Sequence, residues 1–232
     1  MRKRHETKQM LLSVFALGLV FSFASSRVPT KILKREKIVP IGSSAFVHPP
    51  NLVHYQIDPD RSRFVVRAFV GGLLSSFGHN HTIAVRDFSG ELQFSPDNVP
   101  ASSLQMRVRS DSLAVIDKVS ENDRRDIEQR MSAEVLESGK YPEIVFRSVS
   151  VSSNGTTDAQ YQLKISGDLA LHGVTRRVLV SAQLSSSGND LHAHGEFSLR
   201  QSDYKITPPS IAVGTIKVKD ELKFSFDIVA RR

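Results

Sequence analysis

Two histidines near the start of the folded region could bind a metal ion. Residues 75–83 have the sequence SSFGHNHTI and place His79 and His81 two positions apart. In a β-strand alternate side chains share one face, so both imidazoles would lie on the same face as Phe77 and Ile83. Their Cβ atoms would be about 7 Å apart, and one metal ion can bridge them because a histidine nitrogen binds zinc at about 2.0–2.1 Å. The alternative is that both rings hydrogen-bond each other, a serine or a ligand oxygen in a partly polar cavity.

A tight metal site needs a third ligand, and the candidate is His172 in the segment LHGVT. A periplasmic metal-binding or redox-linked protein that uses His79 and His81 is therefore one functional hypothesis. The triplet His-Asn-His also occurs in HNH endonucleases, which require a ββα-metal arrangement. Here the triplet lies in a strand-like run with no helix directly after it, which argues against a nuclease.

The remaining polar segments of the sequence do not indicate a catalytic or metal site. The segment LHAHGEF places His192, His194 and Glu196 on one face of a strand, similar to a set of two histidines and one carboxylate. The opposite face carries Leu191 and Phe197, so the histidine face is expected to be the outer, solvated one. The chain has no Gly-x-Ser-x-Gly motif and no glycine-rich phosphate loop. We therefore expect no catalytic residues and no enzymatic activity.

Composition and charge exclude several classes of protein. Of the 232 residues 40% are hydrophobic and 13 are Phe, which is enough for a large core. The absence of Cys excludes disulfides, cysteine-ligated zinc and a thiol nucleophile. Residues 1–26 carry +3 and residues 27–50 carry +4 of the net charge of +7, so residues 51–232 are balanced. A nucleic-acid-binding protein needs a basic surface on its folded part, so nucleic acid is not an expected partner.

The N-terminal residues have the layout of a secretory signal. In residues 1–26 a basic segment, MRKRHETKQ, precedes an apolar run of about 15 residues and then small residues. The run is shorter than the roughly 20 residues that span a bilayer, and an uncleaved anchor is the alternative. Residues 27–50 contain scattered prolines without a period and predict a basic, flexible linker that can lie near anionic headgroups. The expected location is the periplasm or the extracellular space.

From residue 51 onward, apolar and polar residues mostly alternate. The alternating segments are RFVVRAFV, DFSGELQF, LQMRVRS, YQLKISGDL, VLVSAQL, LHAHGEFSL and IKVKDELKFSFDI. This pattern indicates half-buried antiparallel strands, and about eight of them favour a closed barrel or a sandwich. Residues 120–138 instead have Ile127, Met131 and Val135 at helical spacing, with Ser120 as a cap and Gly139 as a stop. The sequence thus predicts an all-β protein with one inserted amphipathic helix, packed against the barrel or over its mouth.

Three motifs in this region resemble the YceI-like family. They are YQIDP at residues 55–59, KYPEIVFRS at residues 140–148 and GDLALHGVT at residues 167–175. The resemblance runs from residue 55 to the C-terminus and implies an eight-stranded, antiparallel, lipocalin-like barrel within residues 51–232. It also implies an exported bacterial protein that holds a long isoprenoid lipid, such as a polyprenyl chain or a quinone. The segments GGLLSSFGHNHTI and IEQRMSAEVLESG depart from the family pattern, which predicts a reshaped cavity mouth.

We therefore expect a non-enzymatic protein that holds a long apolar lipid and requires no cofactor. A homodimer through a strand edge or the barrel mouth is compatible with this hypothesis, and so is a structural barrel without a ligand. The cavity-facing residues follow from alternation, which a bulge would invert. They are Phe64, Val66, Phe77, His79, His81, Phe88, Leu92, Leu104, Met106, Phe146, Leu163, Ile165, Phe224 and Phe226.

Overall fold

A computed structural model describes residues 51–72, 79–157, 159–211 and 215–232. The expectations for residues 1–26, residues 27–50 and Phe77 lie outside the described residues. The strands are β1 (Val53–Ile57), β2 (Arg63–Gly71), β3 (His81–Val85), β4 (Phe88–Phe94), β5 (Ser103–Arg109), β6 (Leu113–Val115), β7 (Glu143–Thr157), β8 (Gln160–Leu171), β9 (Val174–Ser187), β10 (Asp190–Arg200), β11 (Ser210–Ile211) and β12 (Ile216–Arg231). The helix α1 (Glu121–Arg130) continues as a π-helical turn, Met131–Val135. Within the described part of the chain, no helix is both long and apolar enough to cross a membrane.

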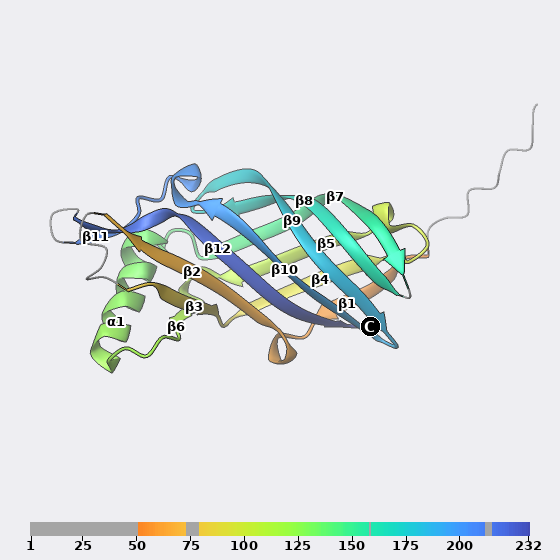
Figure 1. The fold of residues 1–232 in the computed structure, drawn as a ribbon, viewed down its shortest axis with the longest axis horizontal. Coiled ribbons are helices and arrows are strands. Elements are labelled where there is room, and N and C mark those ends of the chain that lie inside the picture. Colours follow the sequence, from red (N-terminus) through yellow and green to blue (C-terminus); the bar gives the residue numbers. More distant parts are fainter. Residues whose placement is uncertain (1–50, 73–78, 158, 212–214) are drawn as a thin grey trace, which may run out of the picture. The chain divides into compact units, whose positions relative to one another are not determined.

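The described strands close into an antiparallel barrel of eight, which confirms the predicted fold (Figure 1). Three of the eight are broken: β1 continues into β2, β3 into β4, and β5 into β6. The order around the barrel is β1/β2, β4/β3, β5/β6, β7, β8, β9, β10 and β12. The last strand closes the ring because β12 pairs with β1 near its end and with β2 further back.

Alternation along the strands separates the interior from the solvent. In β8 the side chains of Tyr161, Leu163 and Ile165 are buried, whereas Gln162 and Lys164 between them are exposed. The same alternation runs through β9 and the first part of β12. Burial of these apolar side chains, at about 25 cal/mol per Å² of apolar surface, is the main force that holds the strands together.

The outer ring atoms of two phenylalanines lie over the backbone of inward-facing glycines. A Cβ atom at Gly167 would lie 2.3 Å from Cζ of Phe146, and one at Gly195 would lie 2.7 Å from Cζ of Phe226. Both glycines lie on strands adjacent to the aromatic residue, since β7 pairs with β8 and β10 pairs with β12. Any side chain at these two positions would collide with the ring, so glycine lets the ring occupy this space.

The helix α1 covers a gap in the barrel wall. Among the described residues β6 pairs with β3 and not with β7, which leaves one edge of β6 without a strand. On that edge the Val115 N–H donates a hydrogen bond to Oε1 of Glu128, 2.8 Å away. A side chain of the helix thus supplies the acceptor that a neighbouring strand would otherwise provide. In Figure 1, α1 and β11 lie at one end of the barrel, and β1 lies toward the other.

The ends of the helix agree with the sequence only in part. The Ser120 hydroxyl accepts a hydrogen bond from the Asp123 N–H at 3.1 Å, as predicted for the N-cap. The predicted stop at Gly139 is wrong, because the helical turns end at Val135. The left-handed residue after them is Glu137, with φ of 45°, and its carboxylate is held by a hydrogen bond to His172.

Candidate functional site

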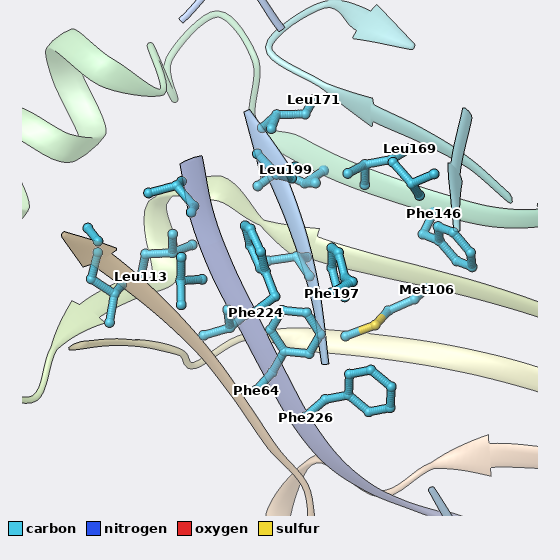
Figure 2. A pocket seen from close by; sticks show the side chains of 18 of the residues that line it. Phe64, Met106, Leu113, Phe146, Leu169, Leu171, Phe197, Leu199, Phe224 and Phe226 are labelled. Atoms are coloured by element: carbon cyan, nitrogen blue, oxygen red, sulfur yellow. The ribbon is translucent and has the colours of Figure 1, made fainter. Parts of the chain in front are cut away.

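A cavity of about 810 Å³ occupies the barrel interior. This volume lies near the upper end of the roughly 300–1,000 Å³ that is typical of small-molecule sites. Every strand of the barrel contributes side chains to it, and so does α1. Figure 2 shows the apolar middle of the cavity, where Phe64, Phe197, Phe224 and Phe226 gather opposite Met106 and Phe146.

Most of the residues that alternation predicted to face the cavity do line it in the structure. Phe88 instead lies in the buried core cluster, 6% exposed, and is not among the side chains that line the cavity. Its ring is covered on all sides at the start of β4, next to the break between β3 and β4. That these residues contact a lipid stays a prediction. The predicted residues that line the cavity are Phe64, Val66, His79, His81, Leu92, Leu104, Met106, Phe146, Leu163, Ile165, Phe224 and Phe226.

An aromatic cluster on β2, β10 and β12 forms one wall. The rings of Phe197 and Phe224 are stacked with centroids 4.7 Å apart, and those of Phe64 and Phe226 with centroids 6.2 Å apart. Phe197 was not predicted as a lining residue, although it alternates with the outer-face residues of LHAHGEF and could have been inferred from them. These rings present a broad, rigid apolar surface, which suits an extended hydrocarbon chain better than a compact polar ligand.

The polar lining side chains gather at the two ends of the cavity. At the end near α1 they are His79, His81, Asp123, Asp126, Arg130, Gln201, Ser210 and Lys217, and at the other end they are Gln93, Ser102 and Ser103. Between them the wall is almost entirely apolar. Such an arrangement suits an amphipathic molecule whose chain fills the middle and whose polar end lies at one mouth.

His81 is held in place by a carboxylate that alternation could not predict. Its Nδ1 lies 3.1 Å from Oδ2 of Asp117, and the same oxygen accepts the Thr82 backbone N–H at 2.8 Å. Both side chains are about one-quarter exposed, at 24% and 23%. Asp117 follows β6, and only the pairing of β6 with β3 brings it beside His81. The neighbouring His79, which was predicted to belong to the same strand, lies just before β3, is exposed and also lines the cavity.

His172 does not join the other two histidines. Its Nε2 lies 2.7 Å from Oε2 of Glu137, its Nδ1 lies 3.1 Å from the Tyr204 carbonyl oxygen, and its ring packs on Tyr141 at 4.6 Å. The side chain is 11% exposed and does not line the cavity. It therefore ties the turn between β8 and β9 to the chain that follows α1.

No three histidine, cysteine or acidic side chains of the described residues are placed so that they could hold a metal ion. Because His172 contacts Glu137 and Tyr204 and does not line the cavity, this structure does not place it as a third ligand beside His79 and His81. On β10, His194 and Glu196 are exposed on the outer face, as alternation predicts. They lie on the opposite side of the wall from Ala193 and Phe197, which line the cavity.

Comparison with known proteins places this barrel in a family. Residues 55–230 match the model of the YceI-like domain. A UPF0312 protein of Vibrio parahaemolyticus is 30% identical over 183 residues, which is 78% of each chain. Protein YceI of Escherichia coli O157:H7 is 28% identical over 160 residues, 65% of this chain and 76% of that protein.

Two solved structures share the fold. BcnA of Burkholderia cenocepacia has a TM-score of 0.60 at 18% identity, with 75% of this chain and 98% of that one covered. A polyisoprenoid binding domain from Saccharophagus degradans, implicated in plant cell wall breakdown, has a TM-score of 0.57 at 13% identity, with 76% and 97% covered. At these identities the likeness concerns the fold. The match to the family model over most of the chain carries the assignment, and the chain belongs to the YceI-like family.

Proposed function

We propose that this protein is a non-enzymatic, exported carrier that holds a long isoprenoid-type lipid inside the barrel. The observation that carries the proposal is the cavity of about 810 Å³, whose middle is apolar on every side and whose ends are polar. The shared fold of the polyisoprenoid binding domain from Saccharophagus degradans supports the same class of ligand.

The proposed mechanism is removal of the chain from water. Each buried CH₂ group contributes about 0.8 kcal/mol, so a five-carbon isoprene unit contributes about 4 kcal/mol before the cost of ordering the chain. A few such units bind firmly without specific polar contacts. The segment of residues 1–26 would direct the protein to the periplasm or the extracellular space, and the basic residues 27–50 would keep it close to anionic lipid headgroups.

Native mass spectrometry of the full chain, purified from bacterial cells without a chelator, tests the proposal. We expect an added mass of several hundred daltons that disappears after extraction with organic solvent, and the fragments of that mass identify the chain. An added mass of one or two metal ions, lost in the His79→Ala variant, would instead support the metal hypothesis and contradict ours. The same spectrum shows whether the protein is a monomer or a dimer.

A further inference from the structure

The pair His81 and Asp117 gives one end of the cavity a defined hydrogen-bonding character. The Oδ2 atom of Asp117 faces both the Thr82 N–H, at 2.8 Å, and Nδ1 of His81, at 3.1 Å. A carboxylate only accepts hydrogen bonds, so in a neutral imidazole the hydrogen lies on Nδ1. A carboxylate that accepts the imidazole N–H in this way fixes the tautomer and makes the other ring nitrogen a better acceptor.

The other nitrogen of this ring, Nε2, has no hydrogen-bond partner among the described residues, and the ring lines the cavity. A lone pair on Nε2 needs a donor, and a ligand hydroxyl supplies one. A carbonyl or ether oxygen cannot, because it carries no hydrogen. A ligand that covers Nε2 without donating a hydrogen bond leaves this acceptor without a partner, which is costly, so the site distinguishes these headgroups.

The charges around this mouth disfavour a phosphate. Besides the histidines, the charged lining side chains of the described residues at this end are Asp123, Asp126, Arg130 and Lys217. Two acids and two bases cancel, so the mouth offers no excess positive charge to a phosphate, which carries one to two negative charges. A neutral headgroup is therefore the better match.

We propose that His81, positioned by Asp117, accepts a hydrogen bond from a hydroxyl at the polar end of the bound lipid, which lies at the α1 end of the cavity. This inference rests on the proposed function and adds the headgroup and the orientation of the ligand. The apolar chain then extends past the aromatic cluster of β2, β10 and β12 toward Gln93 at the opposite end.

The test uses geranylgeraniol and its methyl ether, which share the same chain and differ in the hydroxyl hydrogen. Their affinities for the delipidated full chain are measured by displacement of a fluorescent apolar probe at a pH of about 8, where imidazoles are ordinarily neutral. We expect the alcohol to bind about 3- to 10-fold more tightly than the ether, as one net hydrogen bond predicts. His81→Phe should reduce this ratio to about 1, and Asp117→Asn should lower it, because the amide no longer fixes the tautomer.

The ratio of the two affinities is the readout, since a merely structural defect would lower both affinities together. His194→Gln on the outer face is the matched control and should leave the ratio unchanged. Equal affinities for alcohol and ether in the unmodified protein would overturn the assignment, and so would an unchanged ratio in His81→Phe. If neither probe binds, the proposed function itself fails. A second pair, decylubiquinone and its quinol under anaerobic conditions, distinguishes the sources: a preference for the quinol indicates a phenolic hydroxyl, and its absence an aliphatic alcohol.

Discussion

The Gly167→Ala substitution should destabilise the barrel through clashes with one neighbouring ring and one backbone carbonyl. The new Cβ atom would lie 2.3 Å from Cζ and 2.4 Å from Cε2 of Phe146, and 2.7 Å from the Arg147 carbonyl oxygen. Real Cβ atoms do not approach other atoms this closely. The ring can only move toward the cavity, and the carbonyl oxygen belongs to a paired strand and cannot turn away.

The size of the effect follows from two opposing contributions. Overpacking of this kind costs about 1–3 kcal/mol. Replacement of a strand glycine by alanine returns about 0.5–1 kcal/mol, because glycine loses more backbone freedom on folding. Because the carbonyl oxygen cannot move away, the overpacking cost should fall in the upper half of its range, at about 2–3 kcal/mol. The expected net loss in the free energy of unfolding is then about 1–2.5 kcal/mol, which lowers Tm by about 2–10 °C in a domain of this size.

Thermal unfolding followed by circular dichroism measures this loss, and two further variants test its cause. Gly139→Ala is the matched control, since nothing lies within 4 Å of a Cβ at that position, and its Tm should be unchanged or slightly higher. Phe146→Leu removes both ring atoms of the clash, so the double variant should recover part of the loss and show a coupling energy above about 0.5 kcal/mol. A Gly167→Ala protein as stable as the unmodified one, or a coupling energy of zero, would refute the reasoning.

Three more outcomes test other parts of the structure. Ile165→Asp should abolish binding of geranylgeraniol, because an unpaired carboxylate would enter the apolar cavity. Lys164→Asp, on the outer face of β8, is the control variant. Equal binding by both variants would contradict the assignment of the faces. Glu137→Gln should weaken the 2.7 Å contact with His172 and speed amide hydrogen exchange in residues 121–135 but not in β8, whereas uniform exchange would argue against this anchor. The Ser202 hydroxyl and N–H hold the pKa of Asp220 below its usual value, so its contribution to stability is present above the unfolded-state pKa, about 4, and lost as the pH falls through the lowered folded-state pKa. The Tm difference between the unmodified protein and Asp220→Asn should shrink on acidification through this range, and a constant difference would contradict this account.

The strands were predictable because alternation depends only on local spacing. Each of the seven alternating segments coincides with a strand, and the faces of β8 and β10 are the predicted ones. The helix was placed correctly by Ser120, whose capping hydrogen bond is also local. The end of the helix was not predicted correctly. There Glu137 takes the left-handed conformation and its carboxylate contacts His172, which is 35 positions away in the sequence and cannot be inferred from local patterns.

The site was predictable only where it depends on the faces of the strands. His81 was assigned to the cavity by counting residues in twos, whereas its partner Asp117 depends on the register between β3 and β6. His172 was considered a possible metal ligand from its residue type alone, and its contacts with Glu137 and Tyr204 lie away from the cavity. Residue type and strand face therefore predict the lining, and tertiary contacts decide which polar groups act together.

The volume of the cavity depends on the small residues of the barrel wall more than on the large ones. An eight-stranded barrel is just wide enough either to be filled by side chains or to hold one ligand, so the choice lies with the inward positions. In this barrel inward glycines let the rings of Phe146 and Phe226 lie along the wall, and inward Ala182 and Ala193 leave further space. Large inward residues in the sequence therefore identify the cavity lining but not the cavity volume. The volume depends on small residues on the adjacent strand, because only they leave room for a ring to lie along the wall.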